Sequence, residues 1–302
     1  FANKIWNASR FVMMNLSIDH YELPAADKLE REDKWVLSKL NRLVKEVTEN
    51  LDSFEIGVAS AKVYDFIWDT YCDWYIELTK TRLNGADDTA KLTAQNVLCY
   101  VLVTLLKLLH PFMPFITEEI YQALPHEEQF IMTSRWPEYR ADLAFPEEEA
   151  AMEAVMDTIK AIRARRAEMN VPPSKKAEMQ IVTAQPEPYR QGLHFIQRLA
   201  YASEVSFPET APADVTGQIS VVTHDATAYL PLSELVDLAA ERERIAKELE
   251  KARNGLRITE GKLANEKFVA HAPENVVNAE REKVAKYQEL IAKLEESAKA
   301  MA

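Results

Sequence analysis

The chain has 302 residues, which is enough for two or three compact units with cores of their own. It contains only 6 glycines, which leaves little room for the turns of an all-β fold, so we expect a mainly helical protein. The formal net charge of -12 argues against a nucleic-acid partner for the chain as a whole, but residues 237–302 carry 13 basic and 13 acidic groups and are its least acidic part.

The cysteines and the apolar runs indicate where such a chain resides. Cys72 and Cys99 lie far apart in apolar surroundings, so we expect no disulfide and no metal site, in a reducing, cytoplasmic setting. The longest apolar run, 97–106, ends at Lys107 and is shorter than the roughly 20 residues that a membrane span needs, so we expect no membrane partner. Phe1 lies within an amphipathic pattern, and we therefore expect a piece of a longer protein.

Residues 1–145 are predicted to form an antiparallel helix bundle. Apolar residues recur at helical spacing in four stretches, near 5–16, 37–51, 58–78 and 98–109. Pro111 should end the fourth helix. Thr117 is predicted to cap a short fifth helix that has acidic residues in its first turn.

Residues 146–232 are predicted to form a small α+β module. The pattern favours helices over 152–169 and 189–199, and strands near 179–182, 205–207, 219–222 and 228–230. Residues 233–302 carry a seven-residue apolar repeat in two stretches, which are separated by a helix-breaking segment at 265–273. This repeat predicts an antiparallel coiled-coil hairpin.

Common catalytic motifs are absent from the sequence, which has no GxGxxG, P-loop, HExxH or GxSxG. The six histidines are scattered singly. We interpret His110, which stands at a helix end before a proline, as structural. The chain is therefore expected to perform no chemistry alone.

Three segments resemble the anticodon-binding domain of valyl-tRNA synthetases. The opening run 1–12, FANKIWNASRFV, is similar to the first helix of that domain, and the runs 66–77 and 109–120 are similar to later helices. The two later runs are shared with the isoleucyl and leucyl enzymes, so they indicate only this subgroup of class I synthetases.

The last third of the chain favours the valyl family. Its expected tip, around Phe268 and Pro273, is similar to the tRNA-binding arm of that family. An isoleucyl enzyme would be expected to end in a cysteine-rich zinc module, which two distant cysteines cannot build. The catalytic domain, with its HIGH and KMSKS motifs, and the editing domain are absent; the run 173–176, PSKK, is only superficially similar to KMSKS.

The resemblance implies the C-terminal tRNA-recognition region of a cytoplasmic, monomeric enzyme that uses ATP with Mg²⁺ to join valine to tRNA(Val). It implies that the catalytic residues and the ATP site lie outside this chain, which would hold no cofactor of its own. Two alternatives remain: the equivalent region of an isoleucyl or leucyl enzyme, and a non-enzymatic coiled-coil scaffold that dimerises through its apolar seam and ignores RNA.

The first helix is predicted to contact the anticodon. One stripe of this helix contains the four residues Asn3, Asn7, Arg10 and Met14. Amides and a guanidinium can bond to base edges, and Phe11 can stack on an unstacked base. The alternative is an ordinary solvated helix face. A second stripe, made of Trp68, Tyr71, Trp74 and Tyr75, is interpreted as core packing.

Two basic groups are predicted to contact the tRNA backbone and its outer corner. The first flanks the Pro172–Pro173 break and contains Lys160, Arg163, Arg165, Arg166, Lys175 and Lys176. The second lies toward the tip of the hairpin and contains Lys262, Lys267, Phe268 and His271. The alternatives are solvated charged faces and, for Phe268, a side chain that covers the end of the hairpin.

Overall fold

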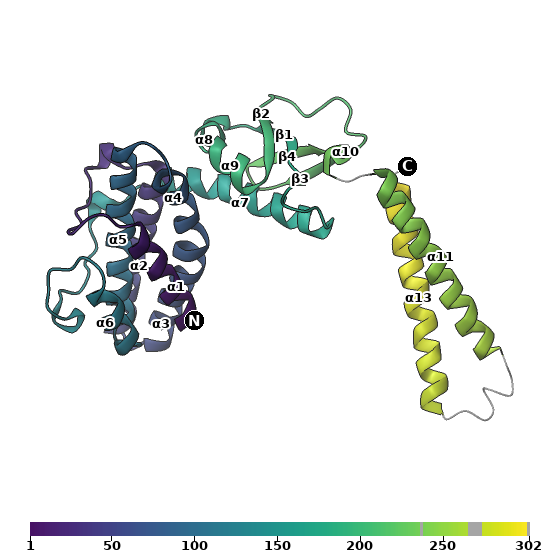
Figure 1. Cartoon of the computed structure of the whole chain (residues 1–302), viewed down its shortest axis with the longest axis horizontal. Coiled ribbons are helices and arrows are strands. Elements are labelled where there is room, and N and C mark those ends of the chain that lie inside the picture. Colours follow the sequence, from purple (N-terminus) through teal and green to yellow (C-terminus); the bar gives the residue numbers. More distant parts are fainter. Residues whose placement is uncertain (236–237, 265–273, 301–302) are drawn as a thin grey trace. The chain divides into compact units, whose positions relative to one another are not determined.

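The computed structural model describes residues 1–235, 238–264 and 274–300, with the side chains of residues 1–235, 246–264, 277–292 and 295. The protein is mostly helical, as predicted, and has one four-stranded sheet (Figure 1). Its chain divides into two compact units. Unit 1 contains residues 1–157 and 187–195, and unit 2 contains residues 158–186 and 196–302.

Unit 1 is the predicted helix bundle. Its helices are α1 (Ala2–Asn15), α2 (Arg31–Asp52), α3 (Ile56–Asp65), α4 (Ile76–Leu83), α5 (Asp88–Leu109), α6 (Pro114–Gln122) and the first part of α7 (Pro146–Glu168). The short 3-10 turns η1 (Ala26–Lys28), η3 (Ile131–Thr133) and η4 (Ala141–Leu143) lie in its links. The helices α8 (Pro186–Gln191) and α9 (Leu193–Leu199) overlap the segment 187–195 that belongs to this unit.

Helix α5 forms the centre of the bundle. It begins where the side chain of Asp87 accepts the N–H groups of Thr89 and Ala90, and its apolar residues are buried on nearly every side. Of the described helices, α5 alone is long and apolar enough to cross a membrane, and most of that stretch is buried inside the protein. Its composition is therefore explained by its place in the core.

The predicted third helix is continuous from α3 to α4, but its middle part is a π-helix, η2 (Phe66–Tyr75). Hydrogen bonds that span five residues instead of four change the direction in which successive side chains point. Tyr71, Trp74 and Tyr75 are buried, which confirms the packing role predicted for them. Trp68, the fourth residue of that stripe, is only half-buried and reaches the surface.

A buried charge cluster ties this irregular helix to α2. Arg82, on α4, donates two hydrogen bonds to Asp33, with distances of 2.7 and 2.5 Å, and lies 2.9 Å from Glu32. The hydroxyl of Tyr75, at the end of η2, donates to the same Asp33 carboxylate at 2.7 Å. Burial alone would lower the pKa of Arg82, but the hydrogen bonds and charges of the two carboxylates raise it, so the guanidinium stays charged.

The first half of α7 packs on α2, which explains where the two units divide. Ser38 donates to Glu149 at 2.9 Å, and Lys34 lies 3.0 Å from Glu148. The residues after 145 therefore belong to the bundle, and the division falls at 157 instead of the expected 145. A separate function for each of the three expected parts stays a prediction.

The prediction that Thr117 caps α6 is wrong. The helix begins at Pro114, whose fixed φ suits a first helical turn, and Met113 precedes it as the capping residue. Thr117 lies inside the helix, where its hydroxyl donates to the carbonyl of Met113 at 2.9 Å. Nδ1 of His110 lies 2.7 Å from the same hydroxyl, which agrees with a structural role for this histidine.

Unit 2 contains the four predicted strands. They are β1 (Ala177–Thr183), β2 (Ala202–Ser206), β3 (Gln218–Val222) and β4 (Ala226–Pro231), in the order β2-β1-β4-β3. β1 and β2 are parallel, and the chain between them contains α8 and α9, because a parallel pair needs a crossover connection. The other two pairs are antiparallel.

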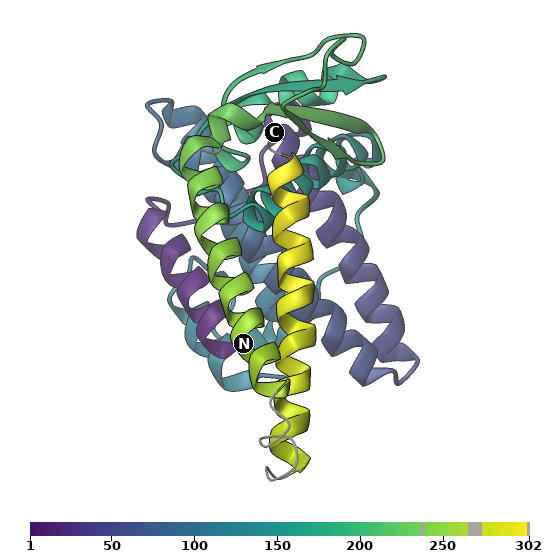
Figure 2. The ribbon, with the colours of Figure 1, turned by 90° about the vertical axis from the view of Figure 1, so that its right-hand side faces the viewer.

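Two long helices follow the short helix α10 (Leu232–Leu235). They are α11 (Leu238–Leu263) and α13 (Glu274–Ala300), which lie side by side (Figures 1 and 2). Arg253 pairs with Glu295 at 2.7 Å, whereas Lys262, further along α11, pairs with Glu280 at 3.5 Å. Because the partner's number falls as the α11 number rises, the two helices are antiparallel.

Replacing Arg82 should destabilise the bundle strongly. The change Arg82→Leu leaves Asp33 and Glu32 buried without a counter-charge, and breaking such a pair costs about 3–5 kcal/mol. Arg140→Leu is a matched control, because Arg140 also binds an aspartate, Asp142, through two hydrogen bonds, but at the surface. Urea unfolding measures the free energy of unfolding, which should change by no more than about 0.5 kcal/mol in the control. Equal losses in the two variants would contradict this role of the cluster.

The stability of the bundle should depend on the protonation of Glu32. Burial raises the pKa of Glu32 to about 7, against the attraction of Arg82. The folded protein therefore holds this proton more tightly than the unfolded chain, so the stabilisation is complete below about pH 4.5 and is lost as pH rises through about 7.

Glu32→Gln keeps the shape of the side chain and removes this titration. Compared with the unchanged protein, the variant should gain on the order of 1–3 kcal/mol of unfolding free energy between pH 5 and pH 8. Urea unfolding at both pH values measures the difference. A difference that does not vary with pH would show that Glu32 titrates normally.

Candidate nucleic-acid interface

Helix α1 presents its predicted contact residues to solvent. Its buried residues, Ile5, Ala8, Ser9 and Val12, follow the i, i+3, i+4, i+7 spacing of a core stripe. At 100° per residue, the stripe of Asn3, Asn7, Arg10 and Met14 lies on the opposite side of the helix, and all four are exposed. No described residue forms a side-chain hydrogen bond or ion pair with Asn3, Asn7 or Arg10.

A surface groove of about 530 Å³ lies between α1 and the helix formed by η2 and α4. It is lined by Phe1, Asn3, Lys4, Asn7, Ala8, Phe11, Trp68, Cys72, Ile76 and Lys80. Three of the five residues predicted to contact the anticodon therefore share one groove: Asn3, Asn7 and Phe11. Arg10 and Met14 are exposed on α1 but do not line it.

One wall of the groove is an ordered series of aromatic rings and a cation. The ammonium of Lys4 lies 3.6 Å from the centre of the Trp68 ring and 2.7 Å from the carboxylate of Asp73. Trp68 also stacks on Tyr64, with an angle of 12° between the rings, and Tyr64 contacts Phe1. These contacts fix the Trp68 ring before any ligand arrives.

The groove combines polar groups with apolar surface. The exposed amides of Asn3 and Asn7 offer both donors and acceptors. The ammonium of Lys80 lies 5.5 Å from the centre of the Phe11 ring. Burial raises the pKa of Cys72 to about 11, so its thiol is neutral. A planar base could stack on the rings and bond to the amides, as unpaired RNA bases do on proteins.

Lys4, Trp68 and Lys80 line the groove but were not among the predicted contacts. Trp68 belonged to a stripe that was assigned to the core, but it lies on the π-helical segment η2 and its side chain reaches the surface. Such a segment leaves no clear pattern in the sequence. Lys4 and Lys80 could have been found only with the neighbouring helix in view, because each acts across the gap between α1 and that helix.

The basic residues near Pro172 do not share one face. Arg163 and Arg165 are both exposed, but residues two positions apart on a helix point to nearly opposite sides. Arg165 pairs with Glu168 at 3.1 Å. Lys160, the first of these residues in the sequence, is exposed. Arg166 is buried, with only 4 % of its surface exposed. Lys175 and Lys176 are exposed in the loop after α7.

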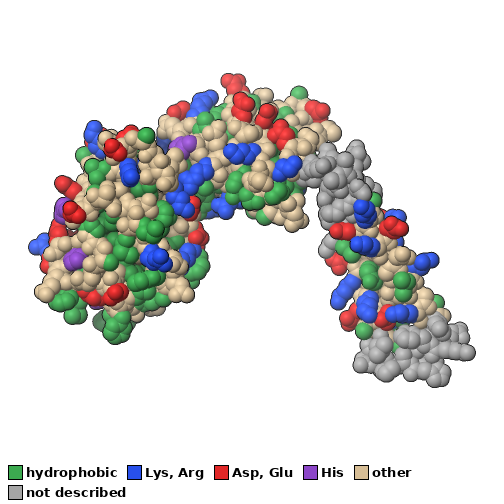
Figure 3. Space-filling model, in the orientation of Figure 1, with side chains coloured by type: hydrophobic (Ala, Val, Ile, Leu, Met, Phe, Trp, Pro, Cys, Tyr) green, Lys and Arg blue, Asp and Glu red, His purple; other side chains and the backbone are tan. Residues whose placement is uncertain are grey.

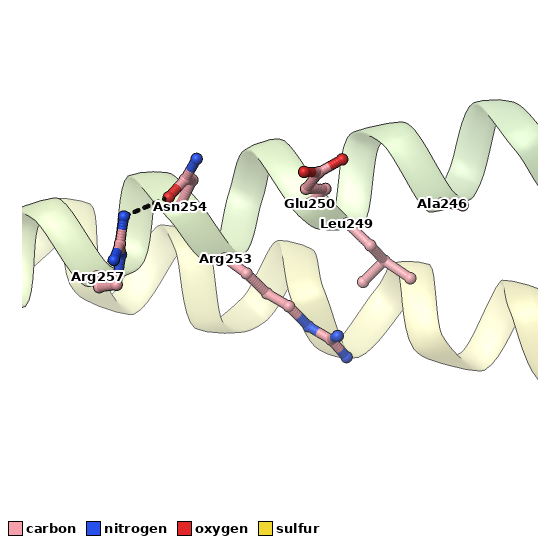
Figure 4. Close-up of a pocket in the computed structure, with 6 residues that line it drawn as sticks. All are labelled: Ala246, Leu249, Glu250, Arg253, Asn254 and Arg257. Carbon is pink, nitrogen blue, oxygen red and sulfur yellow. Dashed lines mark hydrogen bonds between the residues drawn. The ribbon is translucent and has the colours of Figure 1, made fainter.

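Charges of both signs alternate along α11 and α13 (Figure 3). A shallow depression of about 430 Å³ on α11 is lined by Ala246, Leu249, Glu250, Arg253, Asn254 and Arg257. Arg257 donates to the side chain of Asn254 at 3.0 Å, and Arg253 extends toward α13 (Figure 4). This part of the surface offers two guanidinium groups, of which Arg253 is already paired with Glu295.

Lys262 is the one predicted contact near the hairpin tip that the structure describes. It is exposed and lies 3.5 Å from Glu280, a carboxylate that Lys283 also contacts at 2.7 Å. The hydrogen bond from Lys283 lowers the pKa of Glu280, so this carboxylate is ionised and offsets part of the positive charge. Lys267, Phe268 and His271 lie outside the described residues.

The part of the chain that the structure describes shows no cluster of side chains that could bind a metal ion. No three residues among its histidines, cysteines, aspartates and glutamates are placed to share a metal ion. What the described surface offers is amides, aromatic rings and cations, which are groups that bind RNA.

Comparison with known protein families gives two matches. The family described as the anticodon-binding domain of tRNA ligase matches residues 33–181, which include most of the bundle of unit 1. The family described as the valyl tRNA synthetase tRNA binding arm matches residues 237–302, which include α11 and α13. The first match defines the class: the bundle is an anticodon-binding domain of a tRNA ligase.

Curated relatives agree with both matches. The valine–tRNA ligase of Clostridium acetobutylicum is 47% identical over 301 residues, which is 98% of this chain and 34% of the relative. Those of Clostridium tetani and Bacillus cereus are 48% and 43% identical over 293 residues, or 96% of this chain and 33% of each relative. The chain belongs to the valyl-tRNA synthetase family and spans about a third of the length of these relatives.

The contact between α11 and α13 can be tested at a glycine. A Cβ atom at Gly255 would lie 2.6 Å from the ring of Tyr287 on α13, whereas one at Gly261 would meet nothing within 4 Å. Gly261→Ala should stabilise α11 by about 1 kcal/mol through helix propensity. Gly255→Ala should lose that gain, because the Tyr287 ring must move out of its packed position.

Thermal unfolding followed by circular dichroism compares the two variants. Gly261→Ala should unfold at a higher temperature than the unchanged protein. Gly255→Ala should unfold at a lower temperature than Gly261→Ala. If the two alanine variants unfold at the same raised temperature, Tyr287 does not pack against α11 as described.

Proposed function

We propose that the chain is the C-terminal tRNA-recognition region of a bacterial-type valyl-tRNA synthetase, and that its partner is tRNA(Val). The whole enzyme would use ATP with Mg²⁺ to activate valine and transfer it to the tRNA. The valine and ATP sites would lie in the part of the enzyme beyond this chain, which supplies no catalytic residue. We expect the whole enzyme to be cytoplasmic and monomeric.

The anticodon would bind in the groove of α1. The observation that carries this proposal is the coincidence of exposed amides, at Asn3 and Asn7, with stacking surfaces, at Phe11 and Trp68, in one groove of an anticodon-binding fold. Unstacked bases need both kinds of contact, because hydrogen bonds distinguish them and stacking holds them. Arg10 and Met14, beside the groove on the same helix face, would contact the flanking nucleotides.

The remaining predicted contacts would hold the tRNA backbone and its outer corner. Lys160, Arg163, Arg165, Lys175 and Lys176 are exposed cations of unit 2 that can approach phosphates. We propose that α11 and α13 form an antiparallel coiled-coil arm, in which apolar packing stiffens the arm and Lys262, with the tip residues, contacts RNA. The antiparallel pairing of the two helices and the family match over 237–302 support this arrangement.

Binding to tRNA tests the proposal. The chain should bind tRNA(Val) with an affinity that falls as salt rises, because each phosphate contact releases counterions. Asn7→Ala should reduce the preference for tRNA(Val) over the same tRNA with a changed anticodon by about 5- to 150-fold, as expected for a lost base contact of about 1–3 kcal/mol. Fluorescence titration at several salt concentrations measures both quantities.

Two control variants separate base contacts from backbone contacts. Lys262→Gln should weaken binding to both tRNAs equally and reduce the slope of log affinity against log salt by about 1. Lys28→Gln removes an exposed lysine whose one ion pair with a described residue is with Asp27, and it should change neither quantity. Salt-independent binding, or equal effects of Asn7→Ala on both tRNAs, would contradict the proposal.

A further inference from the structure

Arg166 is a buried charge without a counter-charge. Its side chain is 4 % exposed, and its Nε and Nη1 atoms contact neither solvent nor any acceptor among the described residues. No described carboxylate forms an ion pair with it. Burial lowers the pKa of Arg166, but a guanidinium remains charged at neutral pH. A charge in this position is costly unless an anion approaches it.

The one engaged nitrogen of Arg166 shapes the loop between α7 and β1. Nη2 donates to the carbonyl oxygens of Pro172, at 3.3 Å, and of Lys175. The C=O of Lys175 and the N–H of Lys176 belong to the same trans peptide and point in opposite directions. Since the carbonyl points to Arg166, the N–H of Lys176 points away from it, and none of the described residues accepts this N–H.

The loop itself carries positive groups. Lys175 and Lys176 are exposed, and neither forms an ion pair with a described residue. The ring centre of Tyr201 lies 5.4 Å from the guanidinium carbon of Arg166 and covers it on another side. The loop that Arg166 holds through its carbonyl groups thus carries two exposed lysines and one backbone N–H without a described acceptor.

We propose that the loop Pro172–Lys176 is a phosphate-binding site. The N–H of Lys176 and the ammonium groups of Lys175 and Lys176 contact the phosphate, and Arg166 is a positioning residue that holds the loop from beneath. The charge of Arg166 also attracts the anion through a region of low dielectric, where the attraction is stronger than in water. Binding would provide the counter-charge that Arg166 lacks within the described part of the protein.

The phosphate could come from an RNA backbone or from a small phosphate compound. The assignment to RNA rests on the proposed function, whereas the phosphate site does not. A test with pyrophosphate therefore judges the site alone, and a test with tRNA(Val) judges its ligand.

The first arm of the experiment titrates the chain, labelled with ¹⁵N-lysine, with pyrophosphate at constant ionic strength and follows the backbone amide of Lys176 by NMR. Lys176→Gln identifies the signal. The signal should shift with saturation, and Lys175→Gln and Arg166→Gln should weaken binding about tenfold or more. Lys28→Gln, which removes an exposed lysine of unit 1 paired with Asp27, should leave the affinity within about twofold.

Arg166→Gln could also disturb the loop itself, and Lys175→Gln, a change at the surface, keeps the test decisive. No shift of the Lys176 amide, or the same affinity in Lys175→Gln and Lys28→Gln, would overturn the site.

The second arm measures tRNA(Val) binding against salt in Lys175→Gln. A slope reduced by about 1 supports an RNA phosphate as the ligand. An unchanged slope, together with intact pyrophosphate binding, overturns the assignment to RNA and leaves a site for a small phosphate compound. If the chain binds no tRNA at all, the proposed function fails, and the pyrophosphate titration still decides the site.

Discussion

The charge cluster of Arg82, Asp33, Glu32 and Tyr75 is the interaction on which the groove of unit 1 depends. It joins the first turn of α2 to Tyr75, at the end of η2, and to Arg82, near the end of α4. An isolated π-helical segment has poorer backbone geometry than an α-helix and needs tertiary contacts to hold it. By holding Tyr75 and Arg82, the cluster fixes the direction of the helix that carries Trp68. The buried charges, although costly, thus help to hold the shape of the groove between α1 and this helix.

Two guanidinium groups show opposite solutions to the same physical problem. Arg82 is buried with two carboxylates, so its charge is compensated inside the protein. Arg166 is buried with carbonyl groups and an aromatic ring, which satisfy only part of its hydrogen-bonding capacity. The first arrangement serves the fold. The second leaves the charge without a counter-charge among the described residues, and the proposed phosphate would supply one.

The sequence predicted much of the fold because its patterns are local. The helices of the bundle, the four strands and the two long helices at the end each follow from apolar spacing and from proline. Three features needed the structure. The π-helical segment that carries Trp68 has no clear sequence signal, and the packing of α7 on α2 depends on residues more than a hundred positions apart. Thr117 lies inside α6, because the helix begins at Pro114 and Met113 takes the cap position. The stripe on α1 was visible in the sequence, but the groove beside it was not, because its other wall comes from a distant helix.

We propose that the groove of α1 receives bases of the anticodon loop. Hydroxyl-radical footprinting tests it most directly, because the oxidation rate of a side chain reports its own exposure. Full tRNA(Val) should protect Phe11 and Trp68 from oxidation, and a tRNA(Val) fragment that lacks the anticodon arm should not. Equal protection by both RNAs, or no protection of either residue at saturating tRNA(Val), would contradict the claim.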